Sequence, residues 1–318
     1  MKIGVTGALG HIGSRFIHSI KPGVFDKVLL LDNLSTRRYC SLFDLPEKVP
    51  FWFVEGDICT ADLRKHFEEL DVVLHLAAIT DAPSSFERRE EVERVNLEGT
   101  QHVAQACSDC GSAMIFVSTT SVYGTQNDVV DEGCSIDELK PQSPYAEAKL
   151  RAEQHLQGLG KSGALNFIIC RFGTIFGTSP GMRFHTAINK FVWQACTGQP
   201  ITVWPTAMHQ KRPYLDLGDA VRAIDFILDS RLFDQEVYNI LTVNATVHQI
   251  IDLIRKEVPE IGVEFVDSPI MNQLSYTVSC EKFQSRGFRF SGDLAEGIRE
   301  TVSLIRNTRQ TRGVLCRG

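Results

Sequence analysis

The segment KIGVTGALGHIG, residues 2–13, joins a short apolar run to three glycines with the spacing G-x-x-G-x-x-G. The run Lys2–Thr6 is typical of a buried strand, and the residues that follow it have the pattern of a helix. Gly7, Gly10 and Gly13 lie between them. Glycines at such a junction let the backbone approach a pyrophosphate, which the N–H groups at the helix start stabilise. The segment therefore predicts a phosphate-binding turn.

Buried strands and helices alternate through the first half of the chain. Four further apolar runs have the length of buried strands: residues 27–31, 51–55, 71–75 and 113–118. Helical stretches lie between them, including a long one from about Ser84 to Cys110. Continuous rather than alternating apolar runs are typical of strands that helices cover on both faces. The alternation predicts an α/β fold with a doubly wound parallel sheet of Rossmann type.

The pattern becomes less regular after about Gly177, where several prolines interrupt it. Before that point a helix over Tyr145–Leu156 and a strand over Asn166–Arg171 are expected. Later helices are expected over 219–228, 247–257 and 294–306. We predict a Rossmann domain over residues 1–176 and a smaller mixed C-terminal substrate lobe over 177–306, some segments of which can return to the sheet. We predict a flexible tail over 307–318.

Composition and charge argue against several classes of protein. Of 318 residues, 43% are hydrophobic, and the net charge of -6 argues against nucleic acid as a partner. No apolar run approaches the ~20 residues of a membrane span, and the N-terminus does not read as a signal peptide. The nine cysteines follow no disulfide framework, and the pair Cys107 and Cys110 has no second ligand pair for a metal. We expect a soluble cytoplasmic protein without a metal site.

An acidic residue follows the second predicted strand. Asp32 lies about 20 residues beyond the glycine turn, where a carboxylate can accept hydrogen bonds from the adenosine ribose. Its charge would repel a 2′-phosphate, which favours NAD over NADP, although Arg37 and Arg38 lie nearby. The alternative is that Asp32 only caps a loop. Asp57, after the third strand, can lie beside adenine.

Two residues four apart on a predicted helix indicate the chemistry. Tyr145 and Lys149 share one helix face. A phenol with a pKa near ~10 is a poor base at neutral pH, but a neighbouring ammonium and a positively charged nicotinamide favour its phenolate. Tyr145 can then accept a hydroxyl proton while hydride leaves the carbon, and Thr119 can hydrogen-bond the same oxygen. Y-x-x-x-K alone is most often structural; its place after the glycine turn, the acid and a hydroxyl cluster favours catalysis.

These motifs resemble those of the extended short-chain dehydrogenase/reductases, in particular the NAD-dependent sugar-nucleotide epimerase and dehydratase branch. The matching segments are TGALGHIG (6–13), DNLS (32–35), GDI (56–58), HLAA (75–78), VN (95–96), STTSVYG (118–124), SPYAEAK (143–149), RFGTIFG (171–177) and RPYLDLGDA (212–220). The resemblance covers nearly the whole chain. Its motifs are specific to the branch and not to a substrate.

The resemblance implies roles for individual residues. The catalytic residues would be Thr119, Tyr145 and Lys149. Residues that would contact NAD are Gly7, Gly10, His11, Ile12, Gly13, Asp32, Asn33, Ser35, Asp57, Ile58, Leu76, Ala77, Ala78, Asn96, Tyr145, Lys149 and Phe172. Residues that would contact the substrate are Thr119, Thr120, Thr174, Arg183, Asn189 and Arg212. Arg212 would hold the nucleotide diphosphate, because a guanidinium can bind phosphate oxygens in pairs. For Arg183, an exposed surface charge is an equally good interpretation.

The chain departs from the family pattern at several positions. Dehydratases and decarboxylases of this branch carry Glu at the position of Ser121, and dehydratases also carry Asp at Thr120. Loss of water requires a separate acid and base, so hydroxyls at both positions argue against these two reactions. Thr174 replaces the usual Asn of an R-x-x-N motif. Trp204, Pro205 and His209 stand where the family is rich in Gly and Asp, which hints at an unusual sugar or base.

The leading hypothesis is a nucleoside-diphosphate-sugar epimerase that acts at C4 through a 4-keto intermediate and resembles UDP-glucose 4-epimerase. A 4-ketoreductase or dehydrogenase of the same fold is the main alternative, and a dehydratase or decarboxylase is a weaker one. A non-catalytic dinucleotide sensor is the remote alternative. The expected partners are a nucleotide sugar and a second copy of the chain in a homodimer, with no nucleic acid and no membrane.

Overall fold

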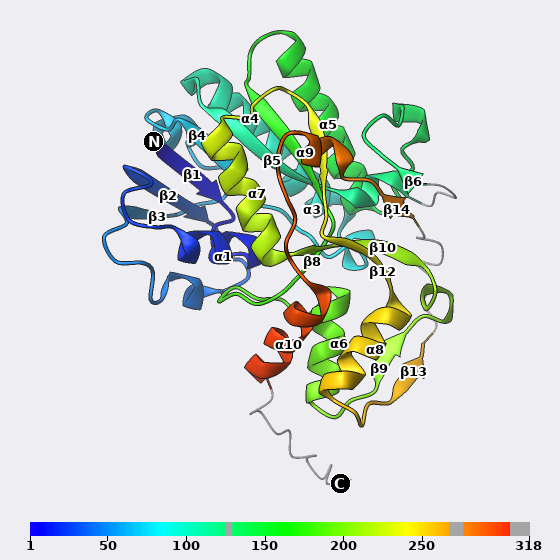
Figure 1. Ribbon diagram of the computed structural model, residues 1–318. Helices are drawn as coiled ribbons and strands as arrows, with labels where there is room; N and C mark the ends of the chain where they lie inside the picture. Colours follow the sequence, from blue (N-terminus) through cyan, green and yellow to red (C-terminus); the bar gives the residue numbers. More distant parts are fainter. Residues whose placement is uncertain (125–128, 267–275, 306–318) are drawn as a thin grey trace.

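A parallel sheet of seven strands forms the centre of the computed structural model, which describes residues 1–124, 129–266 and 276–305 (Figure 1). The strand order is β11-β7-β5-β4-β1-β2-β3, and every neighbouring pair is parallel. The strands are β1 (Lys2–Thr6), β2 (Lys27–Asp32), β3 (Phe51–Glu55), β4 (Val72–His75), β5 (Ala113–Thr119), β7 (Phe167–Phe172) and β11 (Val237–Ile240). The predicted doubly wound Rossmann-type sheet is confirmed.

Helices cover both faces of this sheet. One face packs against α1 (His11–Ser19) and α7 (Leu217–Ser230), and the other against α2 (Leu63–Phe67), α4 (Gly99–Cys110) and α5 (Pro144–Lys161). Neighbouring residues of one strand join different cores: Val28 and Leu30 pack on the α1 side, and Leu29 packs on the α4 side. This two-sided burial explains why the strands read as continuous apolar runs.

A smaller lobe of mixed structure lies below the carboxyl edge of the sheet in Figure 1. Its helices are α6 (Ala187–Cys196), α8 (Val247–Glu257) and α10 (Leu294–Ile305), and they share one hydrophobic core. Short strands β8 (Thr174–Phe176), β10 (Lys211–Asp216) and β12 (Val243–Thr246) form one small sheet, and β9 (Ile201–Val203) pairs with β13 (Val263–Phe265). Two further strands, β6 (Val129–Val130) and β14 (Thr277–Val278), pair beside the large sheet, near α9 (Glu281–Ser285).

The structure refines the predicted boundaries. The lobe predicted over 177–306 returns to the large sheet through α7 and β11, so the chain crosses between the two parts more than once. The helix expected from Ser84 to Cys110 is interrupted: it consists of a 3₁₀ turn (Ser84–Phe86), α3 (Arg89–Glu93), a π-helical turn (Arg94–Glu98) and α4. The predicted tail, residues 307–318, lies outside the described residues.

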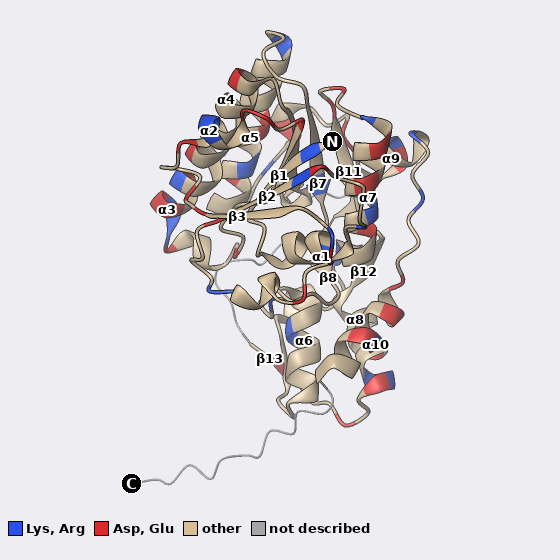
Figure 2. Ribbon diagram, turned by 90° about the vertical axis from the view of Figure 1, so that its left-hand side faces the viewer, with Lys and Arg blue, Asp and Glu red and all other residues tan. Residues whose placement is uncertain are grey.

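Charged residues of both signs lie side by side on the surface helices, for example along α3 and α10 (Figure 2). Several form ion pairs between exposed side chains, such as Arg88 with Glu91 and Arg299 with Glu296. Pairs of this kind add little stability. Within the described part of the chain, no helix is both long and apolar enough to span a bilayer.

A buried polar network joins α5 to three strands of the large sheet. Arg171 on β7 donates to both carboxylate oxygens of Glu153 on α5, with distances of 2.6–3.1 Å. Ser118 on β5, the register partner of Arg171, donates to the same carboxylate. Arg171 also donates to the hydroxyl of Tyr123 (3.0 Å), which donates to Asn239 on β11 (2.9 Å). The network fixes the axial position and rotation of α5 relative to the sheet.

Removal of the carboxylate from this network should destabilise the fold. Glu153→Ala leaves the Arg171 guanidinium, which is 4% exposed, without its anion, and we expect a loss of about 3–5 kcal/mol. Urea unfolding followed by circular dichroism measures it. The matched control is Glu147→Ala on the same helix, which breaks an exposed pair with Arg89 and should cost less than about 1 kcal/mol. Equal losses in the two variants would contradict the role given to the network.

Candidate active site

The glycine turn between β1 and α1 brings the backbone very close to neighbouring segments. Gly7 has a φ of +67°, and a Cβ there would lie 2.6 Å from the backbone nitrogen of Ala77. A Cβ on Gly13 would lie 2.5 Å from the carbonyl oxygen of Ala8. Only glycine satisfies these contacts. The backbone N–H of Leu9 donates to the Asp32 carboxylate (3.1 Å), which ties the turn to the end of β2.

A groove runs from this turn along the carboxyl ends of β1, β2 and β4. The residues predicted from the sequence that line it are Gly7, Gly10, His11, Ile12, Gly13, Asp32, Asn33, Ser35, Asp57, Ile58, Leu76, Ala77 and Ala78. The structure thus brings these predicted positions together. Asn96 is placed differently: its side chain is buried and forms two 2.8 Å hydrogen bonds with the backbone of Ile79. It holds the wall of the groove and does not line it.

The groove has the features that a dinucleotide needs. His11, at the start of α1, is 4% exposed, and its Nε2 atom has no hydrogen-bond partner within the described residues. Burial and the charges of Arg183 and Arg38 lower the pKa of His11 to about 3, so this ring is neutral. An orphaned ring nitrogen, a helix N-terminus and the Arg38 guanidinium in the same groove suit a pyrophosphate, and Asp32 suits the adenosine ribose.

Tyr145 lies in the first turn of α5. Ser143 caps this helix, because its Oγ accepts from the backbone N–H of Ala146 (3.2 Å), and Pro144 occupies the first helical position. Burial raises the pKa of the Tyr145 phenol, whereas a hydrogen bond with Thr119 and the charge of Arg183 lower it. Both partners are thus arranged to favour the phenolate.

Lys149 lies one turn further along α5 and is 2% exposed. Its Nζ donates to the carbonyl oxygen of Val117 (2.8 Å) and lies 4.6 Å from the centroid of the Phe116 ring. Burial lowers the pKa of Lys149 to about 7, and the charge of Glu153 opposes this shift. The sequence alone suggests a permanent ammonium here. Burial instead favours the neutral amine more than in an exposed lysine.

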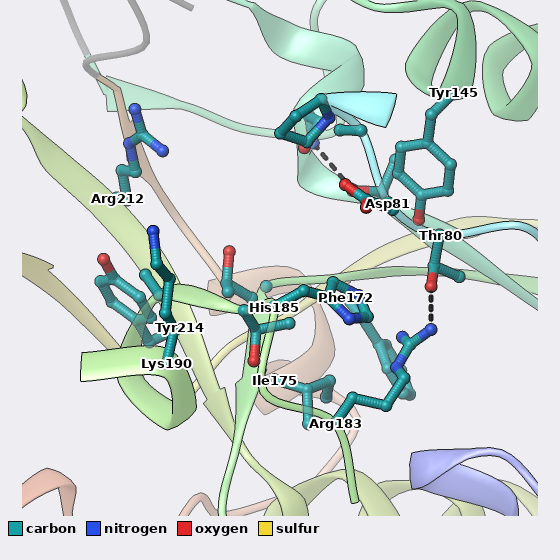
Figure 3. Close-up of a pocket in the computed structure, with 18 of the residues that line it drawn as sticks. Thr80, Asp81, Tyr145, Phe172, Ile175, Arg183, His185, Lys190, Arg212 and Tyr214 are labelled. Carbon is teal, nitrogen blue, oxygen red and sulfur yellow. Dashed lines mark hydrogen bonds between the residues drawn. The ribbon is translucent and has the colours of Figure 1, made fainter. Parts of the chain in front are cut away.

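A second cavity shares Ile12, Leu76, Ala78, Thr80 and Arg183 with the groove and extends into the smaller lobe (Figure 3). Beyond these shared residues, the predicted positions that line it are Thr119, Tyr145, Lys149, Phe172, Thr174 and Arg212. Thr120 and Asn189 do not line it. Thr120 donates to the carbonyl oxygen of Phe172 (3.3 Å), and Asn189 donates to the carbonyl oxygens of Gly177 and Arg183. Asn189 therefore holds the loop that carries Arg183.

Several lining residues were not predicted as site residues: Thr80, Asp81, His185, Lys190, Tyr214 and Tyr276. Three of them carry a sequence signal: Tyr214 belongs to the RPYLDLGDA motif, Lys190 follows Asn189 directly, and Tyr276 lies in a C-terminal segment that is similar to the family. The others come from irregular loops, where no periodicity marks them. Arg212 also shows how this cavity is prepared for a ligand: its Nε and Nη2 atoms are buried without partners among the described residues. A diphosphate would satisfy them.

The profile of the NAD-dependent epimerase/dehydratase family matches residues 3–240. The chain belongs to this family. The family uses NAD, and the groove with its glycine turn, Asp32 and the unpartnered His11 nitrogen fits this cofactor. The described residues contain no group of three or more His, Cys, Asp or Glu side chains arranged to hold a metal ion.

Known relatives include dehydratases and epimerases. A trifunctional UDP-glucose 4,6-dehydratase/3,5-epimerase/reductase of Arabidopsis thaliana is 31% identical over 94% of this chain. The chain spans only 46% of that plant protein. UDP-glucuronic acid 4-epimerase from Bacillus cereus, solved with UDP-glucuronic acid and NAD, is 26% identical with a TM-score of 0.86, and the alignment covers 96% of this chain and 99% of that one.

A third relative is dTDP-glucose 4,6-dehydratase from Streptomyces venezuelae, solved with NAD bound. It is 25% identical with a TM-score of 0.86, over 96% of this chain and 97% of that one. The protein is therefore an NAD-dependent enzyme of the epimerase/dehydratase family. Because relatives of both reaction types have the same fold, the reaction has to be inferred from the residues around Tyr145.

The buried amine of Lys149 should make stability depend on pH in the absence of cofactor. Its pKa is about 7 in the folded state and about 10.4 in an unfolded chain. Between these values the unfolded state binds more protons, so the free energy of unfolding rises with pH. In Lys149→Met this contribution is absent. We expect wild type to gain roughly 1–2 kcal/mol relative to Lys149→Met between pH 7 and pH 8.5.

Urea unfolding of both NAD-free proteins at these two pH values measures the effect. The difference between the two proteins isolates Lys149, because thiols and phenols that titrate in the same range are common to both. A difference that stays constant with pH would show that the amine keeps its proton in the folded protein.

Proposed function

We propose that this protein is a nucleoside-diphosphate-sugar epimerase that inverts C4 of its sugar through a 4-keto intermediate. Three features support the proposal: family membership, the position of Tyr145 in the wall of the cavity that shares residues with the groove, and the side chains next to Thr119. The 4-epimerase from Bacillus cereus has the same fold. The side chains next to Thr119 distinguish epimerisation from dehydration, and the proposal rests mainly on them.

The side chains beside Tyr145 are hydroxyls where a dehydratase needs an acid and a base. Thr119 and Ser121 line the cavity, and Thr120 lies in its wall. The hydroxyl of Tyr276 completes the group, because it hydrogen-bonds Thr120 and Ser121. Elimination of water requires a group that removes a carbon-bound proton and a second that protonates the leaving hydroxyl. An aliphatic hydroxyl does neither at neutral pH.

One carboxylate, that of Asp81, lines the cavity within the described ranges. It follows β4 and accepts a hydrogen bond from the backbone N–H of Ser84 (3.4 Å). It belongs to a different loop from the Thr119–Ser121 hydroxyls. A single carboxylate does not replace the acid–base pair that dehydration uses, so the 4,6-dehydratase activity of several relatives is not proposed for this chain.

Epimerisation needs only a reversible proton transfer at one oxygen. Bound NAD supplies the hydride acceptor and, in the reverse direction, the hydride donor. Tyr145 accepts the C4 hydroxyl proton and later returns it, while Thr119 holds the phenol oxygen in place. Lys149, with a pKa of about 7, can exchange its proton near neutral pH. Arg212 and Lys190 hold the diphosphate on the far side of the cavity, which leaves the sugar free to present either face.

The proposal is tested with purified protein, catalytic amounts of NAD and a panel of nucleotide sugars. NMR or chromatography should show one sugar converted into its C4 epimer to an equilibrium mixture, without added reductant. Accumulation of NADH, measured at 340 nm, or a stoichiometric requirement for NADH would indicate a 4-ketoreductase or dehydrogenase instead. A 4-keto-6-deoxy product would indicate a dehydratase. Either result would remove the proposal.

Removal of the phenol hydroxyl should abolish turnover without abolishing binding. Tyr145→Phe removes the proton acceptor, and loss of such a group lowers kcat by about 10²–10⁴-fold. The affinity for the nucleotide sugar, measured by calorimetry, should change little because most contacts remain. Tyr214→Phe is the matched control, since it removes a second phenol of the same cavity that lies on the Arg212 side (Figure 3). Equal losses of kcat in both variants would contradict the role of Tyr145.

A further inference from the structure

Cations outnumber anions around the sugar cavity. Within the described part of the chain, its lining contains Lys149, Arg183, Lys190 and Arg212 but only one carboxylate, Asp81. Unpaired cations in a partly buried cavity are unfavourable in the free protein, and an anionic ligand offsets this cost. The cavity therefore suits a substrate with substantial negative charge, and the positions of the cations indicate how that charge is distributed.

The cations occupy two separate parts of the cavity (Figure 3). Arg212 and Lys190 lie together on one side, next to Tyr214. Arg183 lies on the opposite side with Thr80, below the hydroxyl end of Tyr145. A diphosphate can contact Arg212, whose Nε and Nη2 atoms have no partner among the described residues, together with Lys190. This leaves the positive charge of Arg183 next to the reacting end of the substrate.

Arg183 is prepared for an anion. Its Nη1 donates to the hydroxyl of Thr80, while its buried Nε has no hydrogen-bond partner among the residues described. Burial and the charge of Arg38 lower the pKa of Arg183 to about 10, and Asp81 opposes that shift without forming an ion pair with it. The charge of Arg183 also acts on the Tyr145 phenol. The guanidinium thus retains an unused donor edge within electrostatic reach of the catalytic oxygen.

The uncharged hydroxyl groups near Tyr145 also suit an anionic group such as a carboxylate. Ser121 lines the cavity, and the Tyr276 hydroxyl contacts both Thr120 and Ser121. Hydroxyls can donate to a carboxylate oxygen, and no acidic side chain in this group would repel one. In a hexose the carbon next to C4 bears C6, so an acidic C6 would lie beside the group that Tyr145 acts on.

We infer that the substrate is a nucleoside-diphosphate hexuronic acid and that Arg183 binds its C6 carboxylate. The inference rests on the proposed C4 epimerisation, and it adds the class of sugar and the residue that selects it. A guanidinium binds a carboxylate in a planar paired geometry, whereas a neutral hydroxymethyl group leaves the same donors unsatisfied. Arg183 therefore discriminates between an acidic and a neutral sugar on the same nucleotide.

One competing role for Arg183 has a structural basis. The residue borders the NAD groove as well as the sugar cavity, so its guanidinium could serve the pyrophosphate of the cofactor. The two roles differ in which affinity falls when the charge is removed. A useful test therefore measures binding of NAD and binding of the sugar separately.

The experiment compares UDP-glucuronic acid with UDP-glucose on the NAD-loaded protein. Turnover is measured with wild type, and calorimetric binding is measured on the Tyr145→Phe background, so that affinity is read without conversion. Each measurement is repeated with Arg183→Met and with Arg183→Lys, which retains the charge. Lys190→Met is the matched control, because it removes a cation on the diphosphate side. NAD affinity is measured for every variant, and melting temperatures verify folding.

We expect wild type to prefer the acidic sugar by at least 10-fold in kcat/KM and in affinity. Arg183→Met should lose roughly 10- to 100-fold for UDP-glucuronic acid and little for UDP-glucose, and Arg183→Lys should recover part of the loss. Lys190→Met should weaken both sugars alike. NAD affinity should be nearly unchanged.

Three results would overturn the inference. If UDP-glucose is epimerised and UDP-glucuronic acid is not, the substrate is not a hexuronic acid, although C4 epimerisation itself is supported. Equal losses for both sugars in Arg183→Met would refute its selective role. A weaker NAD affinity with unchanged sugar preference would assign Arg183 to the cofactor. If neither sugar is turned over, the panel of nucleotide sugars decides the proposed function, while binding on the Tyr145→Phe background still decides whether Arg183 recognises a carboxylate.

Discussion

The buried ion pair between Glu153 and Arg171 is the interaction on which the site depends. It joins α5 to β7, and Ser118 extends it to β5. Tyr145, Lys149 and Glu153 succeed one another at intervals of four along α5, so they share one face of the helix. An anchor at Glu153 therefore fixes the rotation at which the other two meet the sheet edge. The hydrogen bond from Lys149 to Val117 and the Ser143 cap then position the amine and the phenol at the sheet edge.

Burial controls the chemistry of the groups that this anchor positions. It raises the pKa of Tyr145 and lowers that of Lys149, so both groups are driven towards their neutral forms in the cofactor-free protein. Thr119 and Arg183 act in the opposite direction on the phenol. The catalytic oxygen is thus balanced between desolvation and nearby positive charge. A proton acceptor with this balance can take up and release a proton within one catalytic cycle.

The two cavities share Ile12, Leu76, Ala78, Thr80 and Arg183, and Tyr145 lines the second of them. The groove lies at the carboxyl ends of parallel strands, which is where open α/β sheets bind ligands. The sugar cavity is closed by residues from β8, β10 and α6 of the smaller lobe. Arg183 borders both cavities, and Asn189 holds its loop. The irregular loop before α6 therefore places Arg183 where the two cavities adjoin.

Local sequence determined the sheet, the glycine turn and the face of α5 that carries Tyr145 and Lys149. Apolar run length, glycine spacing and helical periodicity are each encoded within a few residues, so they can be predicted before the fold is known. The hydroxyls at Thr119–Ser121 are also visible in the sequence, and the proposed C4 epimerisation rests on them.

Tertiary structure decided which polar side chains reach a ligand. Asn96 and Asn189 were both predicted to contact a ligand, yet both donate to backbone oxygens in the walls of the site. Thr80, Asp81 and His185 come from irregular loops that no motif marks, and they line the same cavity as Tyr145. The ionisation of Lys149 and the unpartnered atoms of Arg183 also depend on burial by residues far away in sequence. Desolvation is a property of the packed surroundings, so a local motif does not contain it.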